Sequence, residues 1–190
     1  AQALLANMSA LYAIYHGEKG LLDISNTIHA NTTQLHDTLV EAGYYIENYN
    51  NYYDTITINH NNAYNIYDTL KEAGYVGYWD KNEPNLLSLS IDETITSSDV
   101  KTISLILKSI TPIQLYKINE RENQSVPNPK ITKTRNSPYL EDSIFNSVNR
   151  NETLFMRYVS YLADKDYGLT HGMIPLGSCT MKENSAYQLE

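Results

Sequence analysis

The sequence predicts an α+β fold, and three observations support this. Some segments repeat apolar residues every three or four positions, as amphipathic helices do, whereas shorter segments alternate apolar and polar residues, as strands do. Two of the strand segments flank a turn containing Asn and Pro, which predicts a hairpin. The predicted order is helix, helix, two strands, helix, two strands, helix. This order indicates a layered α+β domain that ends near Ile110.

Helical spacing begins at the first residues. The apolar positions of the first predicted helix are Leu4, Met8, Leu11 and Tyr15, and those of the second are Leu21, Ile24, Ile28, Leu35 and Leu39. Gly43 is expected to end the second helix, because glycine readily adopts the left-handed conformation found there. Residue 1 is not Met and no capping residue precedes the first helix. We therefore expect an internal piece of a longer polypeptide.

The next segments complete the predicted domain. Strands are expected at residues 44–49, 53–60, 75–80 and 86–91, and helices at residues 62–74 and 97–110. The residues expected to face the core are Ile56, Ile58, Ala63, Ile66, Leu70, Leu87, Leu89 and Ile91. Ser97 or Ser98 is expected to cap the last helix, with Asp99 in its first turn and Lys108 in its last, as the helix dipole favours.

The pattern changes after the predicted domain. Residues 111–150 are polar, contain four prolines and show no sustained period, so we interpret them as a connector. Helical spacing resumes at residue 151, with Leu154, Tyr158 and Tyr161 or Leu162 on one face. The chain is thus divided into residues 1–110, 111–150 and 151–190.

Composition excludes several classes of protein. The chain has 22 acidic and 14 basic residues and a formal net charge of −8, which argues against a nucleic-acid partner. A single cysteine excludes internal disulfides and favours a reducing compartment. No apolar run approaches the roughly 18 residues that span a bilayer, so no membrane partner is expected.

The segment "PLGSCTMK" at residues 175–182 is the best candidate for a binding loop. A turn at Pro175 and Gly177 would leave the backbone amides of Ser178, Cys179 and Thr180 facing a concavity that suits a carboxylate or a phosphate. The two hydroxyls and Lys182 would add donors and positive charge. The alternative is an ordinary surface loop.

Two other kinds of site, a thiol catalyst and a metal site, are alternatives. Cys179 with His171 could form a thiol catalyst, although only Lys182 lies near enough in the sequence to lower the thiol pKa. His29 and His36 are seven residues apart and could share a helix face, but no third ligand accompanies them. No metal site is therefore expected.

Six segments carry a resemblance to a known family. Glycine decarboxylases, the P-proteins of the glycine cleavage system, have similar segments in the same order: "AQALLANM", "YAIYHGEKGL", "SLSIDET", "RNSPYLEDSIFNS", "NETLFMRYVSYLADKDYGL" and "GMIPLGSCTMK". The resemblance implies two homologous halves of the fold-type-I architecture of pyridoxal-phosphate (PLP) enzymes. Residues 1–110 would be the end of the cofactor-free half, a helix and a small α+β domain. Residues 111–150 would join the halves, and residues 151–190 would begin the PLP-binding half.

The resemblance also implies an activity. Such enzymes decarboxylate glycine on PLP and transfer the aminomethyl group to the lipoyl arm of H-protein. The glycine-rich segment with the lysine that binds PLP does not occur in this sequence, so we expect no catalytic residue here and an inactive fragment. Ser178, Cys179, Thr180 and Lys182 are expected to line the cleft of the complete enzyme.

Partners and location follow from the same resemblance. Expected partners are lipoylated H-protein, the remaining parts of the same chain, and a second subunit in a homodimer or a two-subunit assembly. A bacterial cytoplasm is favoured over a mitochondrion. The alternative function is a stand-alone, non-catalytic scaffold or partner-binding remnant of the family.

Overall fold

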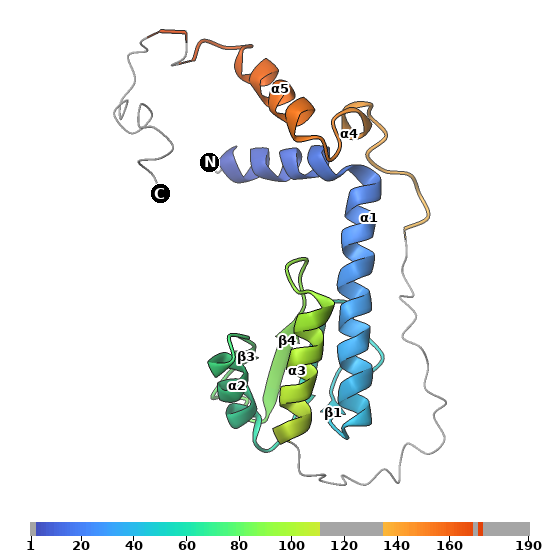
Figure 1. The fold of residues 1–190 in the computed structure, drawn as a ribbon, viewed down its shortest axis with the longest axis vertical. Coiled ribbons are helices and arrows are strands. Elements are labelled where there is room, and N and C mark those ends of the chain that lie inside the picture. The colour runs from blue at the N-terminus through green and yellow to red at the C-terminus, as the bar shows by residue number, and fades with distance from the viewer. Residues whose placement is uncertain (1–2, 111–134, 169–170, 173–190) are drawn as a thin grey trace. The chain divides into compact units, whose positions relative to one another are not determined.

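The computed structural model describes residues 3–110, 135–168 and 171–172. The chain divides into two compact units, which we describe separately. Unit 1 comprises residues 1–21 and 138–190, and unit 2 comprises residues 22–137. Helix α1 begins in unit 1 and continues into unit 2 (Figure 1).

The predicted α+β class is confirmed. The helices are α1 (Ala3–Glu41), α2 (Ala63–Glu72), α3 (Ser97–Ile110), α4 (Ile144–Ser147) and α5 (Glu152–Ala163). The strands are β1 (Tyr45–Ile46), β2 (Thr55–Asn59), β3 (Tyr78–Trp79) and β4 (Leu86–Ser90). All strand pairs in the described residues are antiparallel, in the order β1-β2-β4-β3. The first predicted strand is shorter than expected, and the predicted hairpin forms between β3 and β4.

The sheet has one apolar and one polar face. Ile58 of β2 lies opposite Ile46 of β1 on one side and Leu87 of β4 on the other, and all three side chains are buried. Alternate residues point the other way. There the hydroxyl oxygens of Thr57 and Ser88 lie 2.9 Å apart across the two central strands. The alternation along β2 and β4 therefore fixes which face meets the helices.

The core of unit 2 combines this apolar face with α2, α3 and the C-terminal part of α1. Its fully or nearly buried members are Leu35, Leu39, Tyr44, Ile46, Ile56, Ile58, Ala63, Ile66, Leu70, Leu87, Leu89, Ile91, Val100, Ile103 and Leu107. All eight predicted core residues are in this set. The Tyr44 hydroxyl donates to the Leu107 carbonyl over 2.7 Å, so the one polar tip in the cluster is bonded inside it.

The start of α3 differs from the prediction. Thr96, rather than Ser97 or Ser98, precedes the helix and caps it: its hydroxyl accepts from the Asp99 amide at 3.2 Å. The Asp99 carboxylate in turn accepts from the Thr96 amide at 2.9 Å. This reciprocal pair is a capping box. Three consecutive hydroxyl residues can each cap a helix, and the Asp at the third helical position selects the first.

The two predicted N-terminal helices are confirmed, and they meet at a sharp kink within α1 (Figure 1). Gly17 interrupts α1 with φ of 62° and ψ of −176°, a left-handed φ that glycine adopts without steric cost. The N-terminal part of α1 exposes the apolar face that its spacing predicted, including Leu4 and Met8. At the other end, Gly43 adopts φ of 85° just after the helix, as expected of a C-terminal glycine.

The described residues after 134 contain two further helices. α4 lies within the predicted connector, where no helix was expected. α5 begins as predicted, and the Asn151 side chain caps it by accepting from the Leu154 amide at 3.0 Å. Its less exposed residues are Phe155, Tyr158 and Val159. Of the residues predicted on one face, Leu154, Tyr161 and Leu162 are exposed and Tyr158 is half-buried.

Candidate functional site

The predicted binding residues Ser178, Cys179, Thr180 and Lys182 lie outside the described residues. His171, the base in the thiol alternative, is described. Its Nδ1 accepts from the Gly168 amide at 3.1 Å, and its Nε2 lies 3.3 Å from the Asp164 carboxylate. In this arrangement the neutral ring is protonated at Nε2, and neither nitrogen offers a free lone pair to a thiol. The described geometry therefore does not support His171 as a general base.

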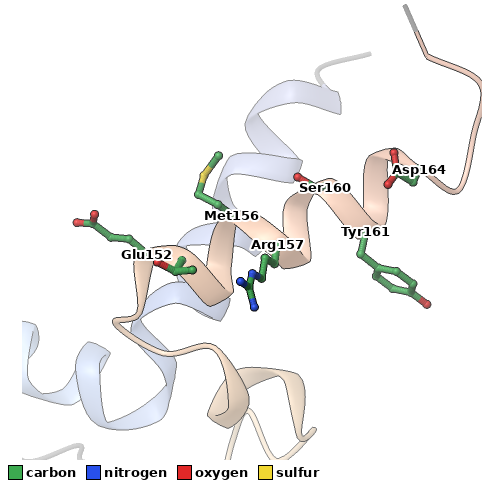
Figure 2. A pocket seen from close by; sticks show the side chains of 7 residues that line it. Glu152, Met156, Arg157, Ser160, Tyr161 and Asp164 are labelled. Carbon is green, nitrogen blue, oxygen red and sulfur yellow. The ribbon is translucent and has the colours of Figure 1, made fainter. Parts of the chain in front are cut away.

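A shallow hollow follows one side of α5 (Figure 2). Its lining residues are Glu152, Thr153, Met156, Arg157, Ser160, Tyr161 and Asp164. They recur at intervals of four along the helix and its C-cap, so a single helix face supplies them all. No residue of α5 is buried. The hollow is an uncovered helix face rather than a cleft that could orient a substrate.

A cluster of histidines and tyrosines lies on unit 2. The ring of His36 stacks on Tyr52 with centroids 4.6 Å apart, and the ring of His29 lies 5.8 Å from the same tyrosine. The two histidines therefore share a helix face, as predicted. Tyr49 packs against His36 at 4.9 Å, and His29 Nδ1 lies 3.0 Å from the Tyr53 carbonyl oxygen. The loop between β1 and β2 supplies all three tyrosines.

The chemistry of this cluster is that of a packing site. His36 is 2% exposed, and its Nδ1 lies 3.1 Å from the carboxylate of Asp37. Burial raises the pKa of Tyr52, which keeps its hydroxyl neutral. In the described ranges no three His, Cys, Asp or Glu side chains gather where they could hold a metal ion. The cluster therefore joins the β1–β2 loop to α1 and has no catalytic arrangement.

A second cluster joins α1 to residues 139–150 within unit 1. The Asn149 side-chain amide donates to the Ile14 carbonyl at 3.1 Å, and the Arg150 backbone amide donates to the Tyr15 carbonyl at 2.9 Å. The Tyr139 hydroxyl donates to the Glu18 carbonyl at 3.1 Å. Sequence reasoning missed these contacts. The available signal was Gly17 between the two predicted helices, because a glycine at such a break can mark a close approach of another segment.

The net negative charge of the chain is concentrated in residues 22–110, which form most of unit 2. Residues 22–110 contain 12 acidic and 4 basic residues, whereas the rest of the sequence contains 10 of each. The difference between 12 and 4 accounts for the whole formal charge of −8. An acidic surface of this kind does not attract a phosphate backbone. Separately, none of the helices in the described ranges is apolar over a length that would cross a bilayer.

The family model and the relatives that match this chain all indicate the same protein family. The model of the glycine cleavage system P-protein family matches residues 1–107. A glycine dehydrogenase (decarboxylating) of Vibrio parahaemolyticus is 38% identical over 100% of this chain, and one of Psychromonas ingrahamii is 42% identical over 98%. A relative from Schizosaccharomyces pombe, whose name includes the word mitochondrial, is 37% identical over 100% of the chain.

The matches cover this chain almost completely but cover little of the relatives. The chain spans only 19% of the Vibrio parahaemolyticus protein and 20% of the Psychromonas ingrahamii protein. The family match nevertheless covers more than half of the chain, and its residues include the bent helix and the whole sheet of unit 2. This chain therefore belongs to the glycine cleavage system P-protein family.

Proposed function

We propose that this chain is a segment of a PLP-dependent glycine decarboxylase. The parent would decarboxylate glycine and transfer the aminomethyl group to the lipoyl arm of H-protein. The observation that carries the proposal is the match to relatives named glycine dehydrogenase (decarboxylating) over 98–100% of this chain. A similarity that extends from end to end favours a shared parent over a chance motif.

The described residues do not fit the role of holding PLP. A lysine that forms a Schiff base lies in a cleft, where its surroundings lower its pKa. All six described lysines are exposed: Lys19, Lys71, Lys81, Lys101, Lys108 and Lys165. None of the ten lysines of the sequence lies in the glycine-rich segment that the resemblance implies, so the cofactor lysine of the proposed parent would lie elsewhere in its chain, and we expect the 190-residue chain to be inactive. PLP, when bound by the parent, supplies the electron sink for decarboxylation.

The segment at residues 175–182 has the composition to contribute to that active site. We propose that the backbone amides and hydroxyls of Ser178 and Thr180, with the charge of Lys182, receive an anionic group of the substrate or cofactor. In this proposal Cys179 contributes only its backbone amide. None of these residues would perform the covalent step, since that step belongs to the cofactor.

The remaining residues would have a structural role. Unit 2 would form the small domain that closes the first, cofactor-free half, and α5 would begin the second half. The N-terminal part of α1 exposes Leu4, Leu5, Met8 and Tyr12 at 42–70%. Burial of apolar surface is favourable by about 25 cal/mol per Å². We propose that other parts of the parent chain cover this face, and that two such subunits or halves assemble around the active site in the cytoplasm of a bacterium.

The proposal is tested on the natural protein that contains this sequence. Its coding sequence should continue past residue 190 into a glycine-rich segment with a lysine. The purified protein should release labelled carbon dioxide from carboxyl-labelled glycine only when PLP and lipoylated H-protein are both added. A natural protein of 190 residues that binds partners without this activity would instead support the scaffold alternative.

The isolated chain provides the complementary test. After incubation with PLP and borohydride, mass spectrometry should find no stoichiometric label on a single lysine, because every described lysine is exposed. Stoichiometric labelling of one residue would contradict the assignment of the cofactor lysine to another part of the parent.

A further inference from the structure

We infer that residues 139–150 form a clamp that holds α1 bent at Gly17. Within the clamp, Tyr139, Asn149 and Arg150 donate hydrogen bonds to carbonyls on both sides of the bend. These residues lie 121–135 positions from the carbonyls that they bond to. Of the segments that resemble the family, "YAIYHGEKGL" contains the bend and "RNSPYLEDSIFNS" contains Tyr139, and Asn149 and Arg150 follow the second segment.

The hydrogen bonds fit the needs of a broken helix. Carbonyls in the turn before a break lose their regular amide partners four residues ahead, and buried carbonyls without partners are costly. Ile14 and Tyr15 lie in that turn, and they receive the Asn149 side chain and the Arg150 backbone amide. After the break, the Glu18 carbonyl receives the Tyr139 hydroxyl. Donors are thus supplied on both sides of Gly17.

The steric contacts show why position 17 must be glycine. A Cβ atom on residue 17 would overlap the Asn149 side-chain amide and the Phe145 carbonyl oxygen. The same Asn149 amide contacts the Phe145 carbonyl, so the two clamp groups are already in close contact. At Gly20, a Cβ atom would come within 3.1 Å of the Arg150 guanidinium. The clamp therefore lies directly against the helix backbone at both glycines.

The backbone of the clamp is itself strained. Leu140 and Arg150 are the two non-glycine residues with positive φ in the described ranges, at 52° and 51°. A side chain makes this conformation unfavourable, so it persists only where the surroundings impose it. Arg150 is the residue whose amide bonds to Tyr15. One of the two strained residues is therefore located at the contact with α1.

Packing supports the same conclusion. Outside residues 22–110, the buried hydrophobic side chains of the described ranges are Ile14, from α1, and Val148, from the clamp. The ring of Phe155 meets that of Tyr15 edge to face, with centroids 5.3 Å apart. The bend and the clamp thus form the small interior of unit 1.

The inference is tested by hydrogen exchange of the 190-residue chain. Gly17→Ala introduces both a strained φ and the steric overlap, whereas Gly74→Ala introduces a strained φ alone, since Gly74 has φ of 90° and nothing within 4 Å of a Cβ. The Arg150 amide reports the clamp, and the Ile58 amide reports the core of unit 2. We expect Gly17→Ala to accelerate exchange at Arg150 on the order of tenfold or more, with Ile58 unchanged. Gly74→Ala should leave Arg150 unchanged.

A second pair of variants keeps the helix sequence intact. Asn149→Ala removes the side-chain donor and should accelerate exchange at Arg150, whereas Asn146→Ala changes an exposed neighbour and should not. Equal exchange at Arg150 in Gly17→Ala, Asn149→Ala and the unmodified chain would overturn the inference. So would equal acceleration by Gly17→Ala and Gly74→Ala, because it would show general destabilisation rather than loss of the clamp.

Discussion

Replacing Leu107 with Ala tests the packing of α3 against the sheet. Leu107 is fully buried, whereas Leu105, two residues earlier on the same helix, is 69% exposed. Truncation of a buried leucine to alanine costs about 2.7–5 kcal/mol, since it removes apolar burial and leaves a cavity. At an exposed position the same change stays within about 0.5 kcal/mol, because no packing is lost. The two variants have identical chemistry and differ in burial.

Thermal unfolding of the 190-residue chain, followed by circular dichroism at 222 nm, measures the difference. Leu107 lies in the core of residues 22–110. A loss of about 3 kcal/mol lowers the Tm of a domain of that length by roughly 12–24 °C. Leu105→Ala should remain within a few degrees of the unmodified chain. Equal shifts for both variants would refute the packing of α3 described here, and a larger shift for Leu105→Ala would mean that the helix presents another face to the sheet.

Three further predictions concern the histidine cluster, α3 and the proposed binding loop. His36→Phe removes the Nδ1 contact to Asp37 together with a buried Nε2 that has no hydrogen-bond partner in the described ranges, so stability in urea unfolding should change by no more than about 1 kcal/mol; a loss well beyond this would show that Nε2 is bonded as well. Hydrogen bonds from Thr96 lower the pKa of Asp99, so its contribution to stability should be present above pH 3.8 and be lost as the pH falls further. Unfolding measured between pH 2 and 7 should therefore show Asp99→Asn least stable relative to the unmodified chain at neutral pH, with the two converging in acid; a constant difference would contradict this. In the complete enzyme, Ser178→Ala and Thr180→Val should each reduce glycine turnover by about tenfold to a hundredfold, and Cys179→Ser should reduce it much less. Lys182→Met should weaken the binding of glycine or cofactor in a salt-dependent manner. Loss of turnover in Cys179→Ser alone would indicate a catalytic thiol.

Local patterns predicted most of unit 2. The buried positions of α2 follow from the spacing of Ala63, Ile66 and Leu70, and those of β4 follow from the alternation of Leu87 and Leu89. In each case the sequence signal and the burial have the same period, so a single segment is sufficient to predict its own inward face. The capping residue of α3 was predicted wrongly as Ser97 or Ser98, because the reciprocal bonds with Asp99 select Thr96.

The break between the two predicted helices was confirmed at Gly17, but the contacts that hold the bend could not be predicted in this way. Gly17 breaks the helical geometry, but a glycine in a helical pattern is compatible with a straight helix, a kink or two separate helices. The choice depends on Tyr139, Asn149 and Arg150, which supply donors from more than a hundred residues away. The residues at 178–182 were likewise selected by resemblance rather than by spacing, and their role stays a prediction.

Spatial contact and sequence order divide this chain differently. Prolines and polar residues change the local pattern at residue 111, whereas the contacts group residues 1–21 with residues 138–190. The reason is visible at Ile14, which is 7% exposed and lies beside the Asn149 amide that bonds its carbonyl. Ile14, just before the bend, therefore contacts a residue at the end of the predicted connector, while Leu35 and Leu39 in the last turns of the same helix pack in the core of unit 2. Each core therefore has its own contacts on α1, and Gly17 is the position in unit 1 at which that helix changes direction.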